Sequence, residues 1–122
     1  MPKKLVIDLD GTLTYLKTGS GYHDVHVNEE VAQKVREYKN NGFDIIICTS
    51  RNMRTYENSI GKINAHTLPV VIDWLNINDI PFDEIHVGKP WCGHEGFYVD
   101  DKAIRPDEFV QLSYEEINKI IK

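Results

Sequence analysis

Four short apolar runs in this chain each lead into polar residues that can take part in chemistry. In chain order, residues 5–7 precede Asp8 and Asp10, residues 43–48 precede Thr49, residues 84–87 precede Lys89, and residues 96–99 precede Asp100 and Asp101. Apolar, β-branched runs of this length, bounded by glycine and polar residues, are typical of strands. Ligands of open α/β sheets bind beyond the carboxyl ends of the strands. We therefore expect four strands whose polar ends converge in space.

The segments between these runs favour helices. Asn28 is a suitable N-cap for an amphipathic helix, and Asn40-Asn41-Gly42 would end it. Thr67-Leu68-Pro69 predicts a second helix, running to about Asn78, because proline is favoured in a first turn. Ser113 begins a capping-box pattern ahead of a short terminal helix.

Alternating strands and helices indicate an α/β fold, a three-layer Rossmannoid parallel sheet with helices on both faces. Three consecutive isoleucines within residues 43–48 favour a strand that is covered on both faces, as in a parallel sheet. The length of 122 residues predicts a single domain, residues 1–122, with a short flap at about residues 14–28. Residues 52–66 have no sustained period, so no helix is assigned to them.

Composition excludes several classes of protein. With 41% hydrophobic and 27% charged residues, the chain matches a soluble globular domain. Fourteen lysines and arginines against nineteen acids give a net charge of −5, which argues against nucleic-acid binding. The apolar runs are all too short to span a membrane, and Asp8 interrupts the one that would serve an export signal. Two cysteines, too few for a disulfide framework, fit a cytoplasmic protein.

The chemistry of the four polar ends favours phosphoryl transfer. Several carboxylates beside one lysine and one hydroxyl need a divalent ion, since both the carboxylates and a phosphoryl group carry negative charge. Mg²⁺ prefers such oxygen ligands. One carboxylate can then act as a nucleophile while a second protonates the leaving oxygen. The spacing of Asp8 and Asp10 holds two carboxylates near one strand end, and Gly11 allows the backbone to approach a phosphate closely.

The residues from 5 to 101 resemble the haloacid dehalogenase superfamily of phosphatases. The resemblance rests on Asp8-Leu9-Asp10-Gly11-Thr12, then Thr49, Lys89 and Asp100-Asp101, which look like the four ordered motifs of that superfamily. It implies that Asp8 is the nucleophile, that Asp10 is the general acid and base, and that Thr49 and Lys89 bind the phosphoryl oxygens.

The same resemblance implies a magnesium site. Its ligands would be Asp8, the backbone carbonyl of Asp10, and Asp100, with Asp101 either a further ligand or a group that orients the others. Ser50 and Arg51 follow the second motif and are taken as further substrate-binding candidates; Arg51 is about equally suited to a surface salt bridge.

A finer likeness is to small phosphatases of capsular polysaccharide biosynthesis, which share Arg51-Asn52-Met53-Arg54-Thr55-Tyr56 and Gly88-Lys89-Pro90-Trp91-Cys92-Gly93. It implies a phosphorylated sugar or glycan precursor as substrate. We expect no separate cap domain, because only about fifteen residues separate the first motif from the first helix. We therefore expect an open site, or one that a homo-oligomer covers.

Other interpretations remain open. His23 and His26 in the flap would contact substrate or be merely exposed, and Trp91 would line the pocket rim. Cys92 and His94 are too few for a zinc site. A receiver-type signalling module uses similar residues, but its acidic pair belongs to the first strand. A weakly catalytic partner within a polysaccharide assembly is a third hypothesis, and dehalogenase or phosphonatase chemistry a distant fourth.

Overall fold

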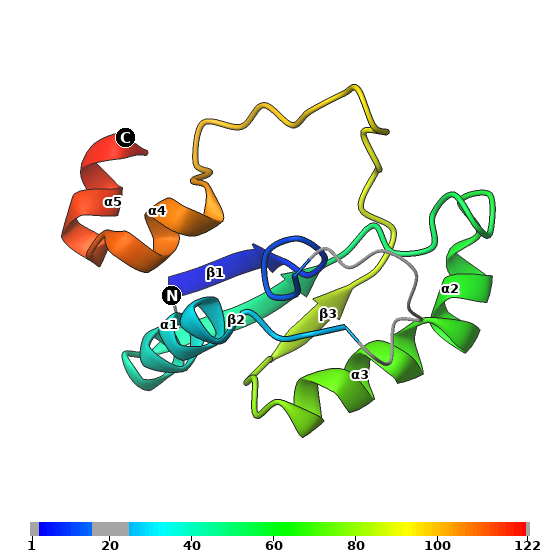
Figure 1. The fold of residues 1–122 in the computed structure, drawn as a ribbon, viewed down its shortest axis with the longest axis horizontal. Coiled ribbons are helices and arrows are strands. Elements are labelled where there is room, and N and C mark those ends of the chain that lie inside the picture. The colour runs from blue at the N-terminus through cyan, green and yellow to red at the C-terminus, as the bar shows by residue number, and fades with distance from the viewer. Residues whose placement is uncertain (1–2, 16–24, 122) are drawn as a thin grey trace. The chain divides into compact units, whose positions relative to one another are not determined.

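The computed structural model describes residues 3–15 and 25–121 of the chain. They form two compact units, Met1–Trp91 and Cys92–Lys122, and each unit is described by itself. The larger unit holds the sheet and three helices, and the smaller holds two short helices (Figure 1).

A three-stranded parallel sheet forms the centre of the larger unit. Its strands are β1 (Lys3–Asp8), β2 (Phe43–Cys48) and β3 (Glu84–His86), in the spatial order β1-β2-β3. The register sets Asp8 level with Cys48, and Cys48 level with His86. All three strands therefore end at the same edge of the sheet, as the sequence predicted for them.

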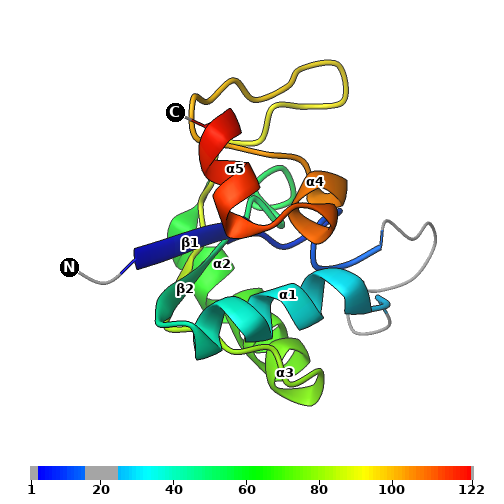
Figure 2. The ribbon, with the colours of Figure 1, turned by 90° about the vertical axis from the view of Figure 1, so that its left-hand side faces the viewer.

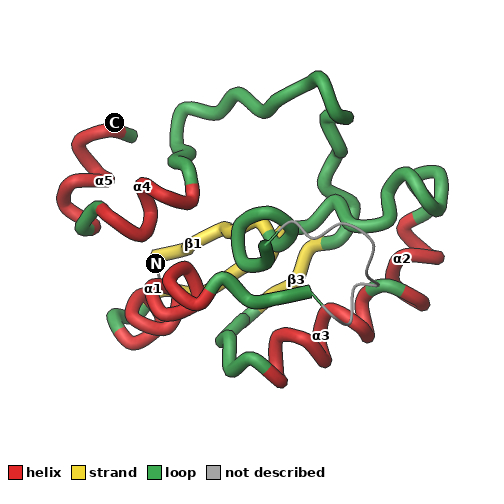
Figure 3. The backbone as a smooth tube through the Cα atoms, viewed as in Figure 1, coloured by secondary structure: helices red, strands yellow, loops and turns green. Residues whose placement is uncertain are grey.

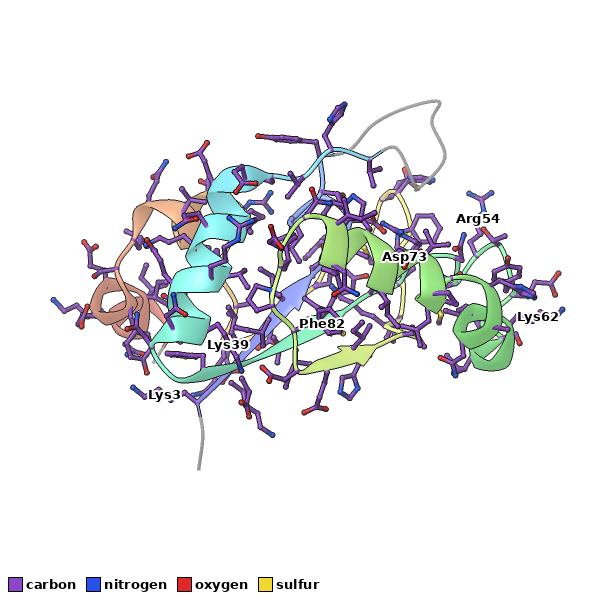
Figure 4. The ribbon with its side chains drawn as sticks, turned by 90° about the horizontal axis from the view of Figure 1, so that it is seen from below. Lys3, Lys39, Arg54, Lys62, Asp73 and Phe82 are labelled. Carbon is purple, nitrogen blue, oxygen red and sulfur yellow. The ribbon has the colours of Figure 1, made fainter. Side chains whose placement is uncertain are left out.

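Two helical connections join these strands. The first is α1 (Glu29–Asn40), and the second consists of α2 (Ile60–His66) and α3 (Leu68–Ile77). Both connections step to the next strand in the same direction, so right-handed crossovers place α1 and α3 on one face of the sheet. Figure 4 shows α1 and α3 together in front of the strands.

Helix α1 begins and ends where the sequence predicts. The side chain of Asn28 accepts a hydrogen bond from the N–H of Val31, which satisfies one of the free donors of the first turn. At the other end, the ring of Tyr38 meets the ring of Phe43 edge to face, with 4.9 Å between centroids. This contact shows that Phe43 lies on the face of β2 that α1 covers.

Strand β2 is the core of the sheet. Ile45 and Ile47 are fully buried on the face of Phe43, and Ile46 is buried on the opposite face. The three isoleucines thus mark a strand that is covered on both faces, as expected from an uninterrupted apolar run.

The helix α2 corrects the sequence analysis, which assigned no helix to residues 52–66. Ser59 caps it, because its hydroxyl accepts a hydrogen bond from the N–H of Lys62 at 3.3 Å. Only one residue of this helix, Ile63, is buried. A seven-residue helix with a single buried position has no apolar period to find, whereas its serine cap could have indicated it.

The smaller unit consists of a long loop and two short helices, α4 (Pro106–Gln111) and α5 (Tyr114–Ile120) (Figure 2). Helix α5 has the predicted capping box: Ser113 Oγ accepts from the N–H of Glu116, and the Glu116 carboxylate accepts from the N–H of Ser113. Helix α4 was not predicted, although Pro106 stands at its start and two acids follow.

The predicted fourth strand, residues 96–99, is not formed. These residues lie in the irregular segment 87–105, drawn as loop in Figure 3, and the sheet has three strands. Phe97 and Val99 are 80% and 88% exposed. An apolar run forms a strand only where the edge of another strand pairs with it. In the described part of the chain, residues 96–99 have no such pairing.

The α/β class, with a parallel sheet flanked by helices, is confirmed. No helix among the described residues is long and apolar enough to cross a membrane. Most of the predicted flap, residues 16–24 with His23, lies outside the described residues. The single-domain prediction stays a prediction.

Candidate active site

The turn after β1 presents two carboxylates. Leu9 is fully buried, and its carbonyl accepts hydrogen bonds from the N–H groups of Thr12, Leu13 and Thr14 at 3.3, 2.9 and 3.1 Å. Gly11 has a φ of +86°. This backbone conformation is strained for residues that carry a side chain, whereas glycine adopts it readily. The buried leucine thus anchors a tight turn that carries an aspartate on either side of it.

Asp8 is held between a cation and a hydroxyl. One carboxylate oxygen, Oδ1, lies 3.3 Å from Nζ of Lys89, and Oδ2 accepts a hydrogen bond from Thr12 Oγ1 at 3.1 Å. Burial raises the pKa of Asp8 above its usual value, and the charge of Lys89 opposes this rise. The site therefore holds a partly desolvated carboxylate beside an ammonium group that offsets its charge.

Asp10 forms a two-pronged ion pair with Arg51. Arg51 Nε donates to Asp10 Oδ2 at 2.9 Å, and Arg51 Nη2 donates to Asp10 Oδ1 at 2.7 Å. The arginine side chain is 1% exposed and that of Asp10 is 28% exposed. Thr14 Oγ1 adds a longer bond of 3.4 Å to Asp10 Oδ1. Two parallel bonds fix the plane of a carboxylate more tightly than one does.

The ends of β2 and β3 meet beside these carboxylates. The N–H of Thr49 donates to the carbonyl of His86 at 2.9 Å, and the N–H of Lys89 donates to the carbonyl of Thr49 at 3.1 Å. These bonds hold the backbone of Lys89 against the end of β2, from which its side chain reaches Asp8 at the end of β1. Gly88, at φ +86°, makes the turn, and the side chain of Ile60 occupies the place where a Cβ would stand.

Thr49 and Ser50 lie in the same turn. Thr49 is 1% exposed, and its hydroxyl accepts a hydrogen bond from the N–H of Arg51 at 3.0 Å. Ser50 is half-buried and its carbonyl accepts from the N–H of Met53 at 3.1 Å. Both stand at the carboxyl end of β2, where the resemblance places phosphoryl-binding groups.

The structure thus brings together most of the predicted site. Asp8 with Lys89, and Asp10 with Arg51, come from segments up to 81 residues apart in the chain. Their predicted catalytic and substrate-binding roles stay predictions.

Asp100 and Asp101 belong to the smaller unit. Both are exposed, and Asp100 Oδ1 accepts a hydrogen bond from the N–H of Lys102 at 2.8 Å. Across the described residues, no three His, Cys, Asp or Glu side chains lie close enough together to hold a metal ion.

The donors of the larger unit are compatible with Mg²⁺. The side chain of Asp10 is engaged by Arg51, so its backbone carbonyl and the carboxylate of Asp8 are the groups that would serve. Mg²⁺ is commonly bound by one or two carboxylates and keeps several waters. The four-carboxylate set inferred from the sequence stays a prediction.

Sequence reasoning missed the partners of the two aspartates. Thr12 and Thr14 each stand four residues after the aspartate they contact, a spacing that the Asp-x-Asp-x-Thr-x-Thr pattern displays. Arg51 was weighed as an exposed residue, yet its side chain is buried. Of the further candidates, His26 and Trp91 are exposed, and Cys92 contacts the carbonyl of Gly93 through its sulfur at 3.5 Å.

The larger unit thus combines a parallel sheet with two carboxylates and a lysine at the ends of its strands, an arrangement that suits a hydrolase. The model of the haloacid dehalogenase-like hydrolase family matches residues 5–76. The chain belongs to this family. No curated protein matches it.

Solved structures agree with this assignment. A structural-genomics target from Vibrio cholerae has 54% sequence identity, covers 98% of this chain and 96% of its own, and superimposes with a TM-score of 0.94. Two structures of the Pnkp1/Rnl/Hen1 complex, one described as an RNA repair complex, have TM-scores of 0.54. They are 21% and 22% identical, cover 77% and 91% of this chain, and match 28% and 34% of their own chains. At that identity they share the fold.

Proposed function

We propose that this hydrolase is a phosphatase that cleaves phosphomonoesters through an aspartyl-phosphate on Asp8. The observation that carries the proposal is the placement of Asp8 between Lys89 and Thr12, with the second carboxylate of Asp10 fixed two residues away by Arg51. A lone carboxylate at a strand end would fit a capped turn. A desolvated carboxylate beside a lysine from another strand end fits a nucleophile.

The residues divide the reaction between them. Asp8 Oδ attacks phosphorus, the bond from phosphorus to the ester oxygen breaks, and Asp10 delivers a proton to the departing alcohol. Asp10 then takes a proton from water, which attacks the phosphoryl group and releases phosphate and free Asp8. Lys89 offsets charge on the phosphoryl oxygens, and the hydroxyl of Thr49 donates a hydrogen bond to them.

Mg²⁺, when bound, would offset the negative charge of phosphate and carboxylate together. Asp8 and the carbonyl of Asp10 would hold it from the larger unit, with Asp100 and Asp101 as the predicted further ligands. We propose a phosphorylated sugar or glycan precursor as the substrate class, on the sequence resemblance, and a cytoplasmic location.

Replacing Asp8 tests the nucleophile. Asp8→Asn keeps the size of the side chain and removes the attacking oxygen anion, so hydrolysis of a generic aryl phosphate in Mg²⁺ should fall by about 10⁴-fold or more. Asp73→Asn is the matched control, because Asp73 is exposed on α3 and outside the site. Full activity of Asp8→Asn would end the assignment.

The same assay separates the competing hypotheses. A phosphorylated Asp8 that persists for hours without turnover would favour a receiver-type module. A wild-type protein that hydrolyses none of the sugar phosphates, nucleotides and phosphorylated glycan precursors would favour the non-catalytic partner. Release of inorganic phosphate from one of these groups would define the substrate class.

A further inference from the structure

We propose that Asn52 and Thr67 are positioning residues for the general acid. Joined by a hydrogen bond, which we call the Asn52–Thr67 bridge, they hold Arg51 where it can orient Asp10. The role of Asp10 as the acid rests on the proposed phosphatase function. The placement of Arg51 by the bridge does not, and all four residues lie in the larger unit.

The hydroxyl of Thr67 serves a distant residue and not the helix where it stands. Thr67 is the C-cap of α2 and the N-cap of α3, yet its side chain makes no capping hydrogen bond to α3. Instead Thr67 Oγ1 donates to Asn52 Oδ1 at 2.7 Å, between positions 15 residues apart in the chain. Threonine is favoured at the start of a helix because its oxygen can accept from a free N–H group there. The bond to Asn52 therefore takes the place of that local role.

The bridge is well formed and largely shielded from water. Its length of 2.7 Å is the usual separation for a hydrogen bond between two oxygens. Thr67 is 3% exposed and Asn52 is half-buried. Water replaces a lost partner poorly at such a place, so removing either side chain would leave the other unsatisfied.

The backbone of Asn52 turns the chain directly after Arg51. Its φ is +63°, in the left-handed region, where asparagine is enriched among residues that carry a side chain. The Asn52 carbonyl accepts a hydrogen bond from the N–H of Tyr56 at 3.0 Å, and Asn52 Nδ2 donates to Thr55 Oγ1 at 3.3 Å. Asn52 thus shapes the loop that follows it, and its Oδ1 ties the start of that loop to the helices.

The backbone of Arg51 is held on either side. Its own N–H donates to Thr49 Oγ1 at 3.0 Å, and its neighbour Asn52 is held by the bridge. From this place the buried guanidinium donates to Asp10 at 2.9 and 2.7 Å. A misplacement of about 1 Å near a reacting group can cost about 10²-fold in rate. Support at the residue next to Arg51 is therefore expected to affect the chemistry of Asp10.

The dependence on the leaving group distinguishes acid catalysis from a purely structural role. A positioned general acid contributes about 10²–10⁴-fold to rate. The contribution is large where the departing oxygen needs a proton, as phenolate does, and small for 4-nitrophenolate, which is more stable as an anion. Loss of the bridge should therefore slow the hydrolysis of phenyl phosphate more than that of 4-nitrophenyl phosphate. A loss of folded protein would slow both equally.

Kinetics with these two substrates in Mg²⁺ tests the role in acid catalysis. Thr67→Val keeps the shape of the side chain and removes the donor. We expect kcat/KM to fall by about 10-fold for phenyl phosphate and by less than about 2-fold for 4-nitrophenyl phosphate. Thr67→Ser, which retains the hydroxyl, should stay close to wild type with both. Asn52→Gly allows the left-handed backbone and removes Oδ1, so it should match Thr67→Val, and the double variant should lose no more than either.

Asn58→Gly is the matched control. Asn58 lies in the same loop, has a φ of +66°, is exposed and takes no part in the bridge. The substitution makes the same change of residue type in the same kind of backbone and leaves the bond between Thr67 and Asn52 intact. Both substrates should be hydrolysed at wild-type rates.

Hydrogen exchange at the Arg51 side chain tests the placement without reference to activity. The Nε–H group of Arg51 is buried and donates to Asp10, so its proton should exchange slowly with water. Its NMR signal can be assigned by its loss in Arg51→Lys. Exchange should become about 10-fold faster or more in Thr67→Val and Asn52→Gly, and should not change in Asn58→Gly.

The outcomes separate this proposal from the phosphatase. Unchanged Arg51 exchange in both bridge variants of an active enzyme would overturn the proposal and leave the phosphatase standing. Equal losses with the two substrates, or no loss with either, would overturn the role in acid catalysis. Faster Arg51 exchange in a protein whose wild type hydrolyses no phosphomonoester would overturn the phosphatase and leave the placement of Arg51 standing.

Discussion

At the scale of single residues, the pair of Asp10 and Arg51 separates structural from chemical roles most clearly. Arg51 is buried and donates two hydrogen bonds to the carboxylate oxygens of Asp10, at 2.9 and 2.7 Å. A lysine at this position could offer only a point charge. The arginine therefore fixes the orientation of Asp10, which a general acid needs, besides stabilising the turn.

Arg51→Lys should lower kcat by about 10-fold with KM little changed, because the proton donor loses its fixed plane. Arg51→Ala should also destabilise the fold by about 3 kcal/mol, since it leaves Asp10 without its partner. Urea unfolding and steady-state kinetics measure the two effects. Arg54→Ala, an exposed arginine three residues away, is the control and should change neither. Equal losses in both arginine positions would contradict the assignment.

The ionised carboxylate of Asp8 is expected to destabilise the folded state, because burial raises its pKa. This destabilisation is present above the ordinary pKa of an aspartate and is absent at pH values below it. Asp8→Asn should therefore raise the melting temperature at pH 7, by about 3 °C, measured without metal ions. At pH 3 the difference between variant and wild type should vanish.

At the scale of elements, one carboxylate ties three of them together. Asp83, just before β3, accepts two hydrogen bonds from Lys39 Nζ of α1 at 2.8 and 2.9 Å, and one from the N–H of Ile45 on β2 at 2.8 Å. These bonds hold the start of β3 against β2 and the end of α1. The bond from Lys39 is the main cause that lowers the pKa of Asp83.

A lowered pKa means that Asp83 stabilises the fold above its unfolded pKa, and that this contribution is lost as the pH falls through the lower folded value. Asp83→Asn should cost about 0.5–1 kcal/mol at pH 7 and little at pH 2. Asp83→Ala should cost more at both, because it also removes the acceptor for the N–H of Ile45. Thermal unfolding across this pH range would reveal the crossover, and a pH-independent loss in Asp83→Asn would contradict it.

At the scale of the whole molecule, the larger unit holds most of the buried side chains that the structure describes, and strand β2 lies at its centre. Ile47→Ala should therefore destabilise the fold by about 3 kcal/mol, measured by urea unfolding, because it leaves a cavity where a fully buried side chain was packed. Ile77→Ala, which truncates an exposed side chain on α3, is the control and should change the free energy of unfolding by less than about 0.5 kcal/mol. Equal losses in the two variants would contradict this account of the core.

The sequence predicted the elements whose patterns are strong and local. Apolar runs predict the strands at residues 43–48 and around Leu5. An N-cap and an apolar period predict the helix after Asn28, and a capping box predicts the terminal helix. The short helices α2 and α4 show no apolar period, because each buries a single residue, Ile63 and Phe109 respectively. Asp8, Asp10 and Lys89 could be predicted to lie near one another because the ends of parallel strands share one edge of the sheet.

The sequence by itself determined that polar residues follow β1, β2 and β3 closely, because apolar runs and local backbone preferences place these three strands. Only the tertiary structure decided that Arg51 is buried on Asp10, since that contact joins positions 41 residues apart. Tertiary structure also decided that residues 96–99 form no strand in the described part of the chain, because a strand exists only where its hydrogen-bonding groups find the edge of another strand.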